Sequence, residues 1–328
     1  MEQRRTIAEG VLRALRDAHR VAICAHVNPD GDTIGSALAL AHGLMQLGKR
    51  VWVYCQDKVP DVLHLLPGWE LVTPPESAAG KRFDLLVPVD VSDETRLGRC
   101  AALLEQCDHS AQIDHHGTNP GYCEQNEIDG TASATALMIA AVLRELGVTM
   151  NREIAICLYV GIATDTGNFA YSNTTAEAFR VVSELMEQHL PLSSIGRVLF
   201  RVKQPCQVLL LTRALNSYRF HHGGEITSMA LSRKDFEDSG ALPEHADTIV
   251  NFGIEVAGVK MAVLGREAGE GRVKISLRAL EPWSVAGVAS RFGGGGHAQA
   301  AGCTLDGPLD EAVRRVVDAM EAELEGRT

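Results

Sequence analysis

The chain has 328 residues, of which 45% are hydrophobic and 22% are charged, and its formal net charge is -11. This composition excludes a disordered chain, and the length predicts two domains with a cleft between them. The negative charge argues against a protein that coats long nucleic acid, because that mode needs a broad basic surface, but it allows a small phosphate ligand.

The sequence carries no sign of export or membrane insertion. It has no uninterrupted apolar run of about 18 residues, and Met1 to Arg5 leads into a polar amphipathic stretch instead of a signal-peptide core. The eight cysteines are scattered, with no CxxC pair and no metal-finger spacing. We therefore expect reduced thiols and a cytoplasmic protein that does not associate with a membrane.

The first part of the chain alternates short apolar runs with amphipathic segments. Strands are predicted at Val21 to Ala25, Val51 to Tyr54, Phe83 to Val89 and Ala111 to Ile113. Helices are predicted at Ile34 to Leu47, Arg96 to Cys107, Ala134 to Leu146, Glu153 to Ala163 and Thr175 to His189. By the usual crossover rules, these elements form a parallel sheet with helices on both faces, and we assign them to a first domain at residues 1–190.

Prolines mark the end of this first domain. Pro191 and Pro205 interrupt the pattern on either side of a helical stretch at Ser193 to Phe200, so we place a linker at residues 191–212. Residues 213–328 are then a smaller α/β domain. Its predicted strands are Glu225 to Leu231, Lys260 to Leu264 and Val273 to Leu280, with a hairpin loop at Glu267 to Gly271 and helices at Trp283 to Arg291 and Leu309 to Glu325.

Acidic and imidazole side chains follow three of the predicted strands at the point where each strand ends. They are His26, Asp30 and Asp32 after the first strand, Asp90 after the third, and Asp114, His115 and His116 after the fourth. A single aspartate in such a place usually caps a helix or a turn, and a lone histidine usually makes a structural hydrogen bond. The conjunction instead favours a cation site, because the carboxyl ends of parallel strands line the ligand crevice of an open sheet.

A further carboxylate, Asp165, lies near the end of an otherwise apolar helix, in the segment Gly161 to Phe169. Burying an unpaired carboxylate costs several kcal/mol, and a bound cation would compensate that cost. We therefore expect Asp165 to join the same site.

The segments HVNPDGD, VDVSD, DHH and GIATDTGNF resemble the four motifs of the DHH phosphoesterase superfamily, in the same order and over nearly the whole chain. The superfamily includes RecJ-like exonucleases, class II pyrophosphatases, exopolyphosphatases and cyclic-dinucleotide phosphodiesterases. The resemblance implies two divalent cations, with manganese as the family expectation. It assigns His26 and Asp30 to one cation, Asp32, His115 and Asp165 to the other, and Asp90 as the bridge. Mixed imidazole and carboxylate ligands suit manganese, although zinc, cobalt or iron could also be accommodated.

Two cations roughly 3.5–4 Å apart would activate a bridging water as the nucleophile and clamp the phosphoryl oxygens. His116, which is not needed as a ligand, would donate to the phosphate or to the leaving-group oxygen. The alternative for His116 is a structural hydrogen bond to Asp90 or to a backbone carbonyl.

The glycine run before His297 is similar to the GGGH element of the DHH-associated C-terminal domain. Glycines allow backbone N–H groups to approach an anion closely, although a glycine run alone is equally consistent with a flexible turn. The resemblance implies a substrate-binding set of Arg278, Gly294, Gly295, Gly296 and His297. For Arg278 the alternative is a surface salt bridge.

Within the RecJ-like branch, the short chain resembles bifunctional oligoribonucleases (nanoRNases) that also act as pAp phosphatases. We expect hydrolysis of short RNA or DNA oligonucleotides to mononucleotides, and of 3′-phosphoadenosine 5′-phosphate to AMP. The sequence does not indicate from which end an oligonucleotide is cleaved. The alternatives are a cyclic di-AMP phosphodiesterase, a pyrophosphatase or polyphosphatase and, from another class, a catalytically inactive nucleotide-binding regulator. The resemblance also implies a homodimer.

Overall fold

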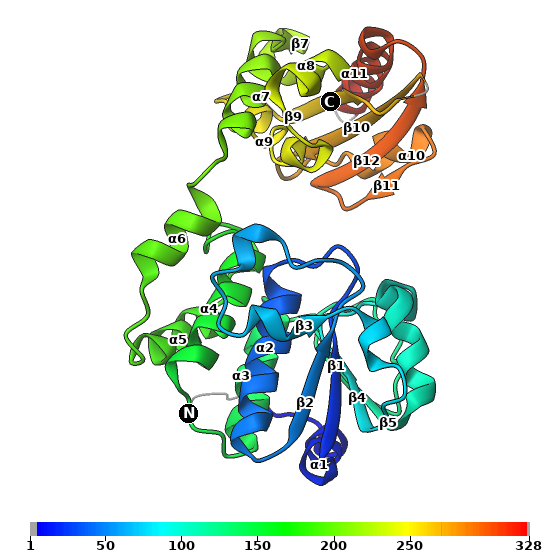
Figure 1. The fold of residues 1–328 in the computed structure, drawn as a ribbon. Coiled ribbons are helices and arrows are strands. Elements are labelled where there is room, and N and C mark those ends of the chain that lie inside the picture. The colour runs from blue at the N-terminus through cyan, green and yellow to red at the C-terminus, as the bar shows by residue number, and fades with distance from the viewer. Residues whose placement is uncertain (1–4, 270, 327–328) are drawn as a thin grey trace. The chain divides into compact units, whose positions relative to one another are not determined.

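The computed structural model describes residues 5–269 and 271–326, so the first four residues of Met1 to Arg5 and Glu270 of the predicted hairpin loop lie outside it. The chain divides into two compact units, the first ending at Val202 and the second beginning at Lys203. Each unit has its own sheet and its own core (Figure 1). The predicted α/β class, with a parallel sheet first and a smaller α/β domain second, is confirmed. The predicted domain limits stay predictions.

The first unit contains a six-stranded sheet in the order β3-β2-β1-β4-β5-β6, and every neighbouring pair is parallel. Its strands are β1 (Arg20–Cys24), β2 (Arg50–Tyr54), β3 (Val72–Thr73), β4 (Phe83–Pro88), β5 (Cys107–Asp114) and β6 (Gln125–Ile128). The chain extends the sheet in one direction from β1 to β3 and in the other from β4 to β6. The order therefore reverses between β1 and β4, which is where ligands bind in sheets of this kind.

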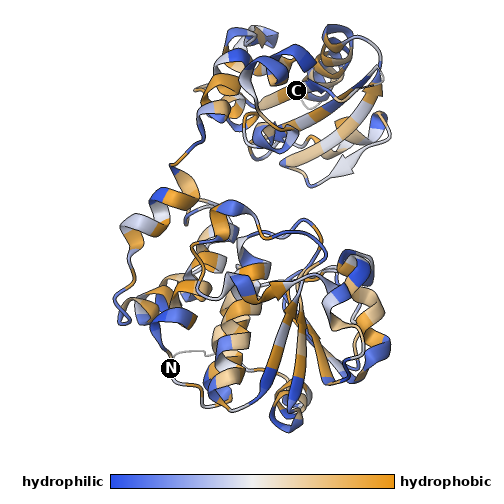
Figure 2. Ribbon diagram, viewed as in Figure 1, coloured by the Kyte–Doolittle hydropathy of each residue, from blue (hydrophilic) through white to orange (hydrophobic). Residues whose placement is uncertain are grey.

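Helices cover both faces of this sheet (Figure 1). On one face, the core joins strand residues such as Ile23 and Val87 to the helices α1 (Glu9–Asp17), α2 (Gly31–Gln46), α3 (Thr135–Glu145) and α4 (Arg152–Asp165). The other face packs Phe83 and Leu86 against Leu97 and Leu103 of η4 (Glu94–Gln106). Apolar residues accordingly run along these strands and helices (Figure 2). The unit ends with α5 (Ala176–Met186) and α6 (Leu192–Phe200).

Two glycines let α2 pack closely against α4. A Cβ at Gly35 of α2 would lie 2.5 Å from the carbonyl oxygen of Cys157, and one at Gly161 of α4 would lie 2.7 Å from both the Cβ of Ala136 and Oδ1 of Asp32. Such distances are too short for ordinary carbon contacts, so a methyl group at either position would push the helices apart. The close approach holds the first turn of α2, which carries Asp32, against α3 and α4.

Substituting Gly35→Ala should therefore destabilise the protein by about 1–3 kcal/mol or more, because the added methyl overlaps backbone atoms of α4. Gly196→Ala is the matched control. It lies inside α6 with no atom within 4 Å of its added Cβ, and the change should be neutral or stabilise by about 0.5–1 kcal/mol. Urea denaturation of both variants measures the difference, and equal stabilities would contradict the packing argument.

The second unit is built on a mixed sheet in the order β11-β12-β10-β9-β8-β7, in which β8 and β9 are parallel and the other pairs are antiparallel. Its strands are β7 (Arg219–His221), β8 (Ile226–Leu231), β9 (Met261–Glu267), β10 (Arg272–Ala279), β11 (Gly295–Gly296) and β12 (Ala300–Asp306). One face packs against α10 (Ala286–Arg291) and α11 (Leu309–Glu325). Over β8 and β9, the other face packs against α7 (Pro205–Asn216), η6 (Pro243–Ala246) and α9 (Asn251–Ile254), with α8 (Arg233–Ser239) beside them.

The predicted elements are present, with small shifts at their ends, but one differs in kind. The stretch predicted as a helix at Arg96 to Cys107 is a 3₁₀ helix, interrupted at Gly98, where φ is +54°. Among the described residues, five strands and four α-helices have no counterpart in the prediction: β3, β6, β7, β11, β12, α1, α7, α8 and α9. In the part of the chain that the structure describes, no helix combines the length and apolar character needed to cross a membrane.

Candidate metal centre

The six residues predicted as metal ligands come together beyond the carboxyl ends of β1, β4 and β5. Two groups, each with ligand atoms within 4.8 Å of one another, are formed by His26, Asp30 and Asp90 and by Asp32, His115 and Asp165. A third group joins Asp90 to His115 and His116, so Asp90 belongs to more than one group. The structure therefore assembles the expected donor set, while ligation itself stays a prediction.

In the first group, the imidazole of His26 faces two carboxylates. Its Nε2 atom lies 3.6 Å from Oδ2 of Asp30 and 3.5 Å from Oδ2 of Asp90, and its Nδ1 lies 2.9 Å from the carbonyl oxygen of Val27. A proton on Nδ1 would be donated to this carbonyl and leave the lone pair of Nε2 directed at the carboxylates, as is usual for a histidine ligand. The other tautomer, with the proton on Nε2, would instead let Nδ1 accept from Nη2 of Arg96, at 2.9 Å.

Asp30 also caps a helix, which is the role that a single aspartate at a strand end usually has. Its Oδ1 accepts hydrogen bonds from the backbone N–H groups of Asp32, at 3.0 Å, and Thr33, at 3.1 Å, and so caps the first turn of α2. Its Oδ2 remains directed at His26. One carboxylate therefore both fixes the helix start and presents an oxygen to the site.

In the second group, His115 is oriented in the same way as His26. Its Nε2 lies 3.3 Å from Oδ2 of Asp165 and 3.5 Å from Oδ1 of Asp90, while Nδ1 lies 3.2 Å from the carbonyl oxygen of Ala132. Asp165 is the last residue of α4. The C-terminal end of a helix disfavours a negative charge, so the helix does not itself stabilise this carboxylate.

Asp32 is fully buried and connects α2 to α3. Its Oδ2 accepts from the backbone N–H of Thr135, at 2.6 Å, and its Oδ1 from that of Ala136, at 2.9 Å, both in the first turn of α3. Oδ1 also accepts from the hydroxyl of Ser36, at 3.1 Å. The hydroxyl of Thr135 in turn donates to Oδ1 of Asp90, at 2.9 Å. The N-terminus of α3 thus holds two of the predicted ligands in place.

The electrostatics of the cluster indicate a deficit of positive charge. Burial and the nearby charges of Asp90 and Asp165 raise the pKa of Asp32 well above its usual range. For Asp165, burial together with the charges of Asp90 and Asp30 outweighs the opposing effect of His115 and raises the pKa to about 7. A divalent cation would relieve this repulsion, and imidazole and carboxylate donors suit it chemically. The residues present therefore fit the expected metal.

His116 is held by Asp114, and not by Asp90 or a backbone carbonyl as considered from the sequence. Its Nδ1 lies 2.7 Å from Oδ1 of the fully buried Asp114, and 3.7 Å from Oδ1 of Asp90. The side-chain amide of Asn119 donates to Oδ2 of Asp114, at 2.6 Å. The hydrogen bond to Asp114 raises the pKa of His116 above its ordinary value, despite partial burial. This favours an imidazolium whose Nε2 can donate.

Sequence reasoning missed Arg96 and Asn119. Nη2 of Arg96 lies 2.9 Å from Nδ1 of His26, and its Nε is buried without a hydrogen-bond partner among the described residues. Arg96 follows Asp90 by six residues and Asn119 follows His116 by three, but no periodicity or motif marks either as part of a site. Only the folded loops bring them to the histidines.

The residues predicted to bind substrate lie in the second unit. Arg278 is on β10, where its Nε donates to Oδ1 of Asn251, at 3.2 Å. Gly295 and Gly296 form β11, and the exposed His297 occupies the turn to β12, with its backbone N–H donating to the carbonyl of Ala300, at 2.8 Å.

The three glycines differ in what the fold requires of them. A Cβ at Gly294 would lie 2.1 Å from the carbonyl oxygen of Gly302, and Gly296 has φ of +142°. Both positions therefore need glycine for the backbone itself. A Cβ at Gly295 would meet no atom within 4 Å. Gly295 and Gly296 are both exposed, and Gly295 is the one of the three at which the fold itself does not require glycine.

Comparison with known proteins agrees with this arrangement. Residues 20–162 match the DHH family N-terminal domain, and residues 227–326 match the DHHA1 domain. The chain is 37% identical, over 98% of its length and 95% of the relative's, to the bifunctional oligoribonuclease and PAP phosphatase NrnA of Thermus thermophilus. This chain belongs to the DHH family. Its membership confirms the sequence-based expectation of a phosphoester hydrolase with DHH and DHHA1 domains.

More distant relatives extend over most of the chain. The bifunctional oligoribonuclease and PAP phosphatase NrnA of Bacillus subtilis is 25% identical to this chain, over 89% of this chain and 91% of its own length. A crystal structure of an exopolyphosphatase-related protein from Bacteroides fragilis has a TM-score of 0.89 at 24% identity and covers 98% of both chains. At that identity the last similarity establishes the fold alone.

A divalent cation should stabilise the protein through the candidate centre. At a hundredfold excess over its Kd, Mn²⁺ contributes about 2.7 kcal/mol, which corresponds to a rise in Tm of about 5–10 °C. Asp90→Ala should abolish most of this rise because it removes the residue shared between groups. Asp61→Ala, at a well-exposed position, is the matched control. Differential scanning fluorimetry with and without Mn²⁺ measures the effect, and equal shifts in all three proteins would place the cation elsewhere.

Proposed function

We propose that this DHH-family hydrolase cleaves short oligonucleotides to mononucleotides and 3′-phosphoadenosine 5′-phosphate to AMP, with two Mn²⁺ ions. The observation that carries the proposal is the cluster of buried carboxylates and oriented imidazoles around Asp90. The oligoribonuclease and PAP phosphatase named among the relatives supports this choice of substrate. The expected cytoplasmic location and the homodimer stay predictions.

In this proposal, His26 and Asp30 hold one cation and Asp32, His115 and Asp165 hold the other. Asp90 is shared between them. When bound, the cations supply an activated water and stabilise negative charge on the phosphoryl oxygens. His26 and His115 would each donate from Nδ1 to a backbone carbonyl oxygen, of Val27 and of Ala132, and so keep the two Nε2 atoms directed into the site.

His116 is the proton donor in the proposed reaction. Asp114 fixes its Nδ1, so Nε2 is the nitrogen left to donate to the phosphate or to the leaving oxygen. The side chain of His116 is 39% exposed, which keeps it accessible to a substrate. The DHHA1 residues Arg278, Gly294, Gly295, Gly296 and His297 would bind the substrate, with the open backbone at Gly295 next to an anion.

A panel of substrates tests the proposed function. Purified protein with Mn²⁺ should release AMP from 3′-phosphoadenosine 5′-phosphate and mononucleotides from a dinucleotide, faster than it degrades a 24-mer RNA, cyclic di-AMP or pyrophosphate. Asp90→Ala should lose this activity. Product chromatography gives the rates. A preference for cyclic di-AMP would replace the proposal with a cyclic-dinucleotide phosphodiesterase, and a preference for pyrophosphate would replace it with a pyrophosphatase.

Asp114→Asn tests the role of His116 separately from metal binding. An amide at this position no longer stabilises the imidazolium, so kcat should fall by about 10²-fold while Mn²⁺ still raises Tm. Asp108→Asn, an exposed position on the same strand, is the matched control and should leave kcat unchanged. An unchanged kcat in Asp114→Asn would show that His116 does not transfer a proton.

A further inference from the structure

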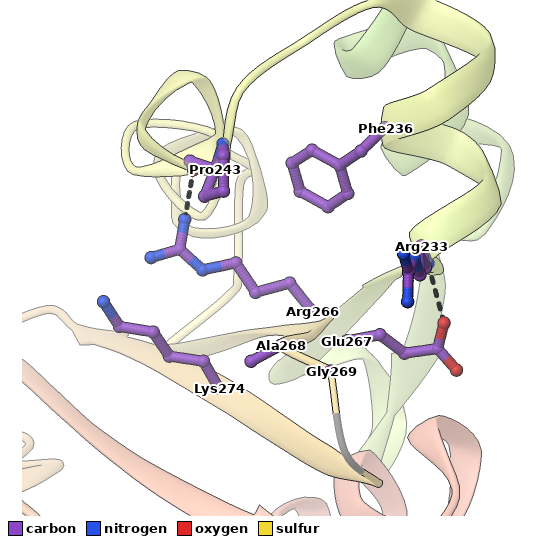
Figure 3. Close-up of a pocket in the computed structure, with 8 residues that line it drawn as sticks. All are labelled: Arg233, Phe236, Pro243, Arg266, Glu267, Ala268, Gly269 and Lys274. Atoms are coloured by element: carbon purple, nitrogen blue, oxygen red, sulfur yellow. Dashed lines mark hydrogen bonds between the residues drawn. The ribbon is translucent and has the colours of Figure 1, made fainter.

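The second unit contains a pocket that is lined by none of the residues assigned a role above. It has a volume of about 420 Å³ and is lined by residues that include Arg233, Phe236, Pro243, Arg266, Glu267 and Lys274 (Figure 3). This volume falls within the range of small-molecule sites, about 300–1,000 Å³. The pocket lies beside the start of β10, between that strand, the end of β9 and the segment around α8.

The pocket combines an aromatic wall with positive charge. In Figure 3 the ring of Phe236 extends from α8 toward the pocket, and the side chains of Arg266 and Lys274 run below it. Lys274 pairs directly with Arg266 in the antiparallel register of β10 and β9. Asp247 compensates the charge of Arg266, so Lys274 is the member of this pair that can attract an anion. The one carboxylate among the lining residues, Glu267, accepts from the backbone N–H of Arg233.

Of the three cationic side chains that line the pocket, one has no carboxylate partner among the described residues and can bind an anion. Arg266 is almost fully buried, where it donates to the carbonyl oxygen of Pro243, at 2.5 Å, and pairs with Asp247, at 2.8 Å. Arg233 pairs with Glu237, at 3.0 Å, on the exposed side of α8. Lys274 is exposed, and no carboxylate of the described residues is paired with it. Its ammonium is therefore the group that can meet an anionic ligand in the pocket.

The pocket shares a sheet face with Arg278, one of the residues proposed to bind substrate. Along β10, Val273, Ile275 and Leu277 point into the core, so Lys274, Ser276 and Arg278 point to the opposite face. Lys274 and Arg278 are four residues apart, which corresponds to about 13 Å along a strand. At roughly 3.4 Å per stacked nucleotide, a single nucleotide held at Arg278 does not reach Lys274, whereas an oligonucleotide of about four units spans the distance.

From this arrangement we propose that the pocket at Phe236 and Lys274 binds the remote nucleotide of a single-stranded oligonucleotide whose reacting end is held at Arg278. A base stacks on Phe236 and its phosphate pairs with Lys274. Stacking on an aromatic ring accepts any base, so the pocket would select for length and not for sequence. This inference rests on the proposed function.

Selectivity between substrates of different length tests the proposal. For the full chain with Mn²⁺, the ratio of kcat/KM for a tetraribonucleotide to kcat/KM for 3′-phosphoadenosine 5′-phosphate should fall about tenfold in Lys274→Ala. Lys234→Ala is the matched control, because it removes an equal charge from α8 outside the pocket, and it should leave the ratio unchanged. An equal fall in both variants, or none in Lys274→Ala, overturns the proposal.

The stacking contact is tested by a double-mutant cycle in which one change is made in the protein and the other removes a base from the substrate. Phe236→Leu, which retains an apolar side chain for folding, should lower kcat/KM for the tetraribonucleotide about tenfold. On a tetraribonucleotide that lacks the base farthest from the released mononucleotide, Phe236→Leu and the wild-type protein should have the same kcat/KM. Equal losses on both substrates overturn the assignment of Phe236.

Failure of the proposed function gives a different result. In that case the wild-type protein hydrolyses none of these substrates, and binding of a labelled tetraribonucleotide is measured by fluorescence anisotropy instead. Weaker binding by Lys274→Ala than by Lys234→Ala would support the pocket as an oligonucleotide site. Equal binding by the two variants would overturn it.

Discussion

The carboxylate of Asp32 is the group on which the arrangement of the centre depends. It stands in the first turn of α2, accepts two backbone N–H groups from the start of α3, and lies where Gly161 brings α4 within van der Waals distance. Three helices therefore meet at one buried charge. Its cost of burial is offset in part by the capped helix, whose N-terminus favours a negative charge. The remaining repulsion from Asp90 and Asp165 is left for a cation to neutralise.

This arrangement makes the ligands of the centre structural parts of the first unit. Asp30 caps α2 and Asp32 caps α3, while Asp90 is held by the hydroxyl of Thr135. Asp30 and Asp90 are each fixed through Oδ1 and direct Oδ2 at His26. Asp32 is fixed through both oxygens. Such preorganisation costs little at the moment of binding, because the positions are already set by the packing of the helices.

Much of the first unit could be predicted because its chemistry is local in sequence. The strands are apolar and short, and their ends carry acids and histidines, so the gathering of these side chains at one edge of the sheet follows from the pattern. The choice of six ligands among them came from the family resemblance. The edge strand β6 was missed because its residues, Gln125 to Ile128, are mostly polar. The strand β12 was missed because Ala300 to Gly302 lack the β-branched side chains typical of strands. Arg96, Asn119 and the pocket at Phe236 depend on contacts between distant segments, which no local pattern records.

Each of the two units has its own hydrophobic core, and no metal-ligand group identified in the described residues lies in the second. The chain need not then unfold as one cooperative system. Under the proposed function, damage to the core around β9 and β10 would abolish activity while the cation centre stays folded. Inactive variants would then fall into two classes that an activity assay alone would merge: those that have lost the metal, and those that have lost the unit proposed to bind the substrate.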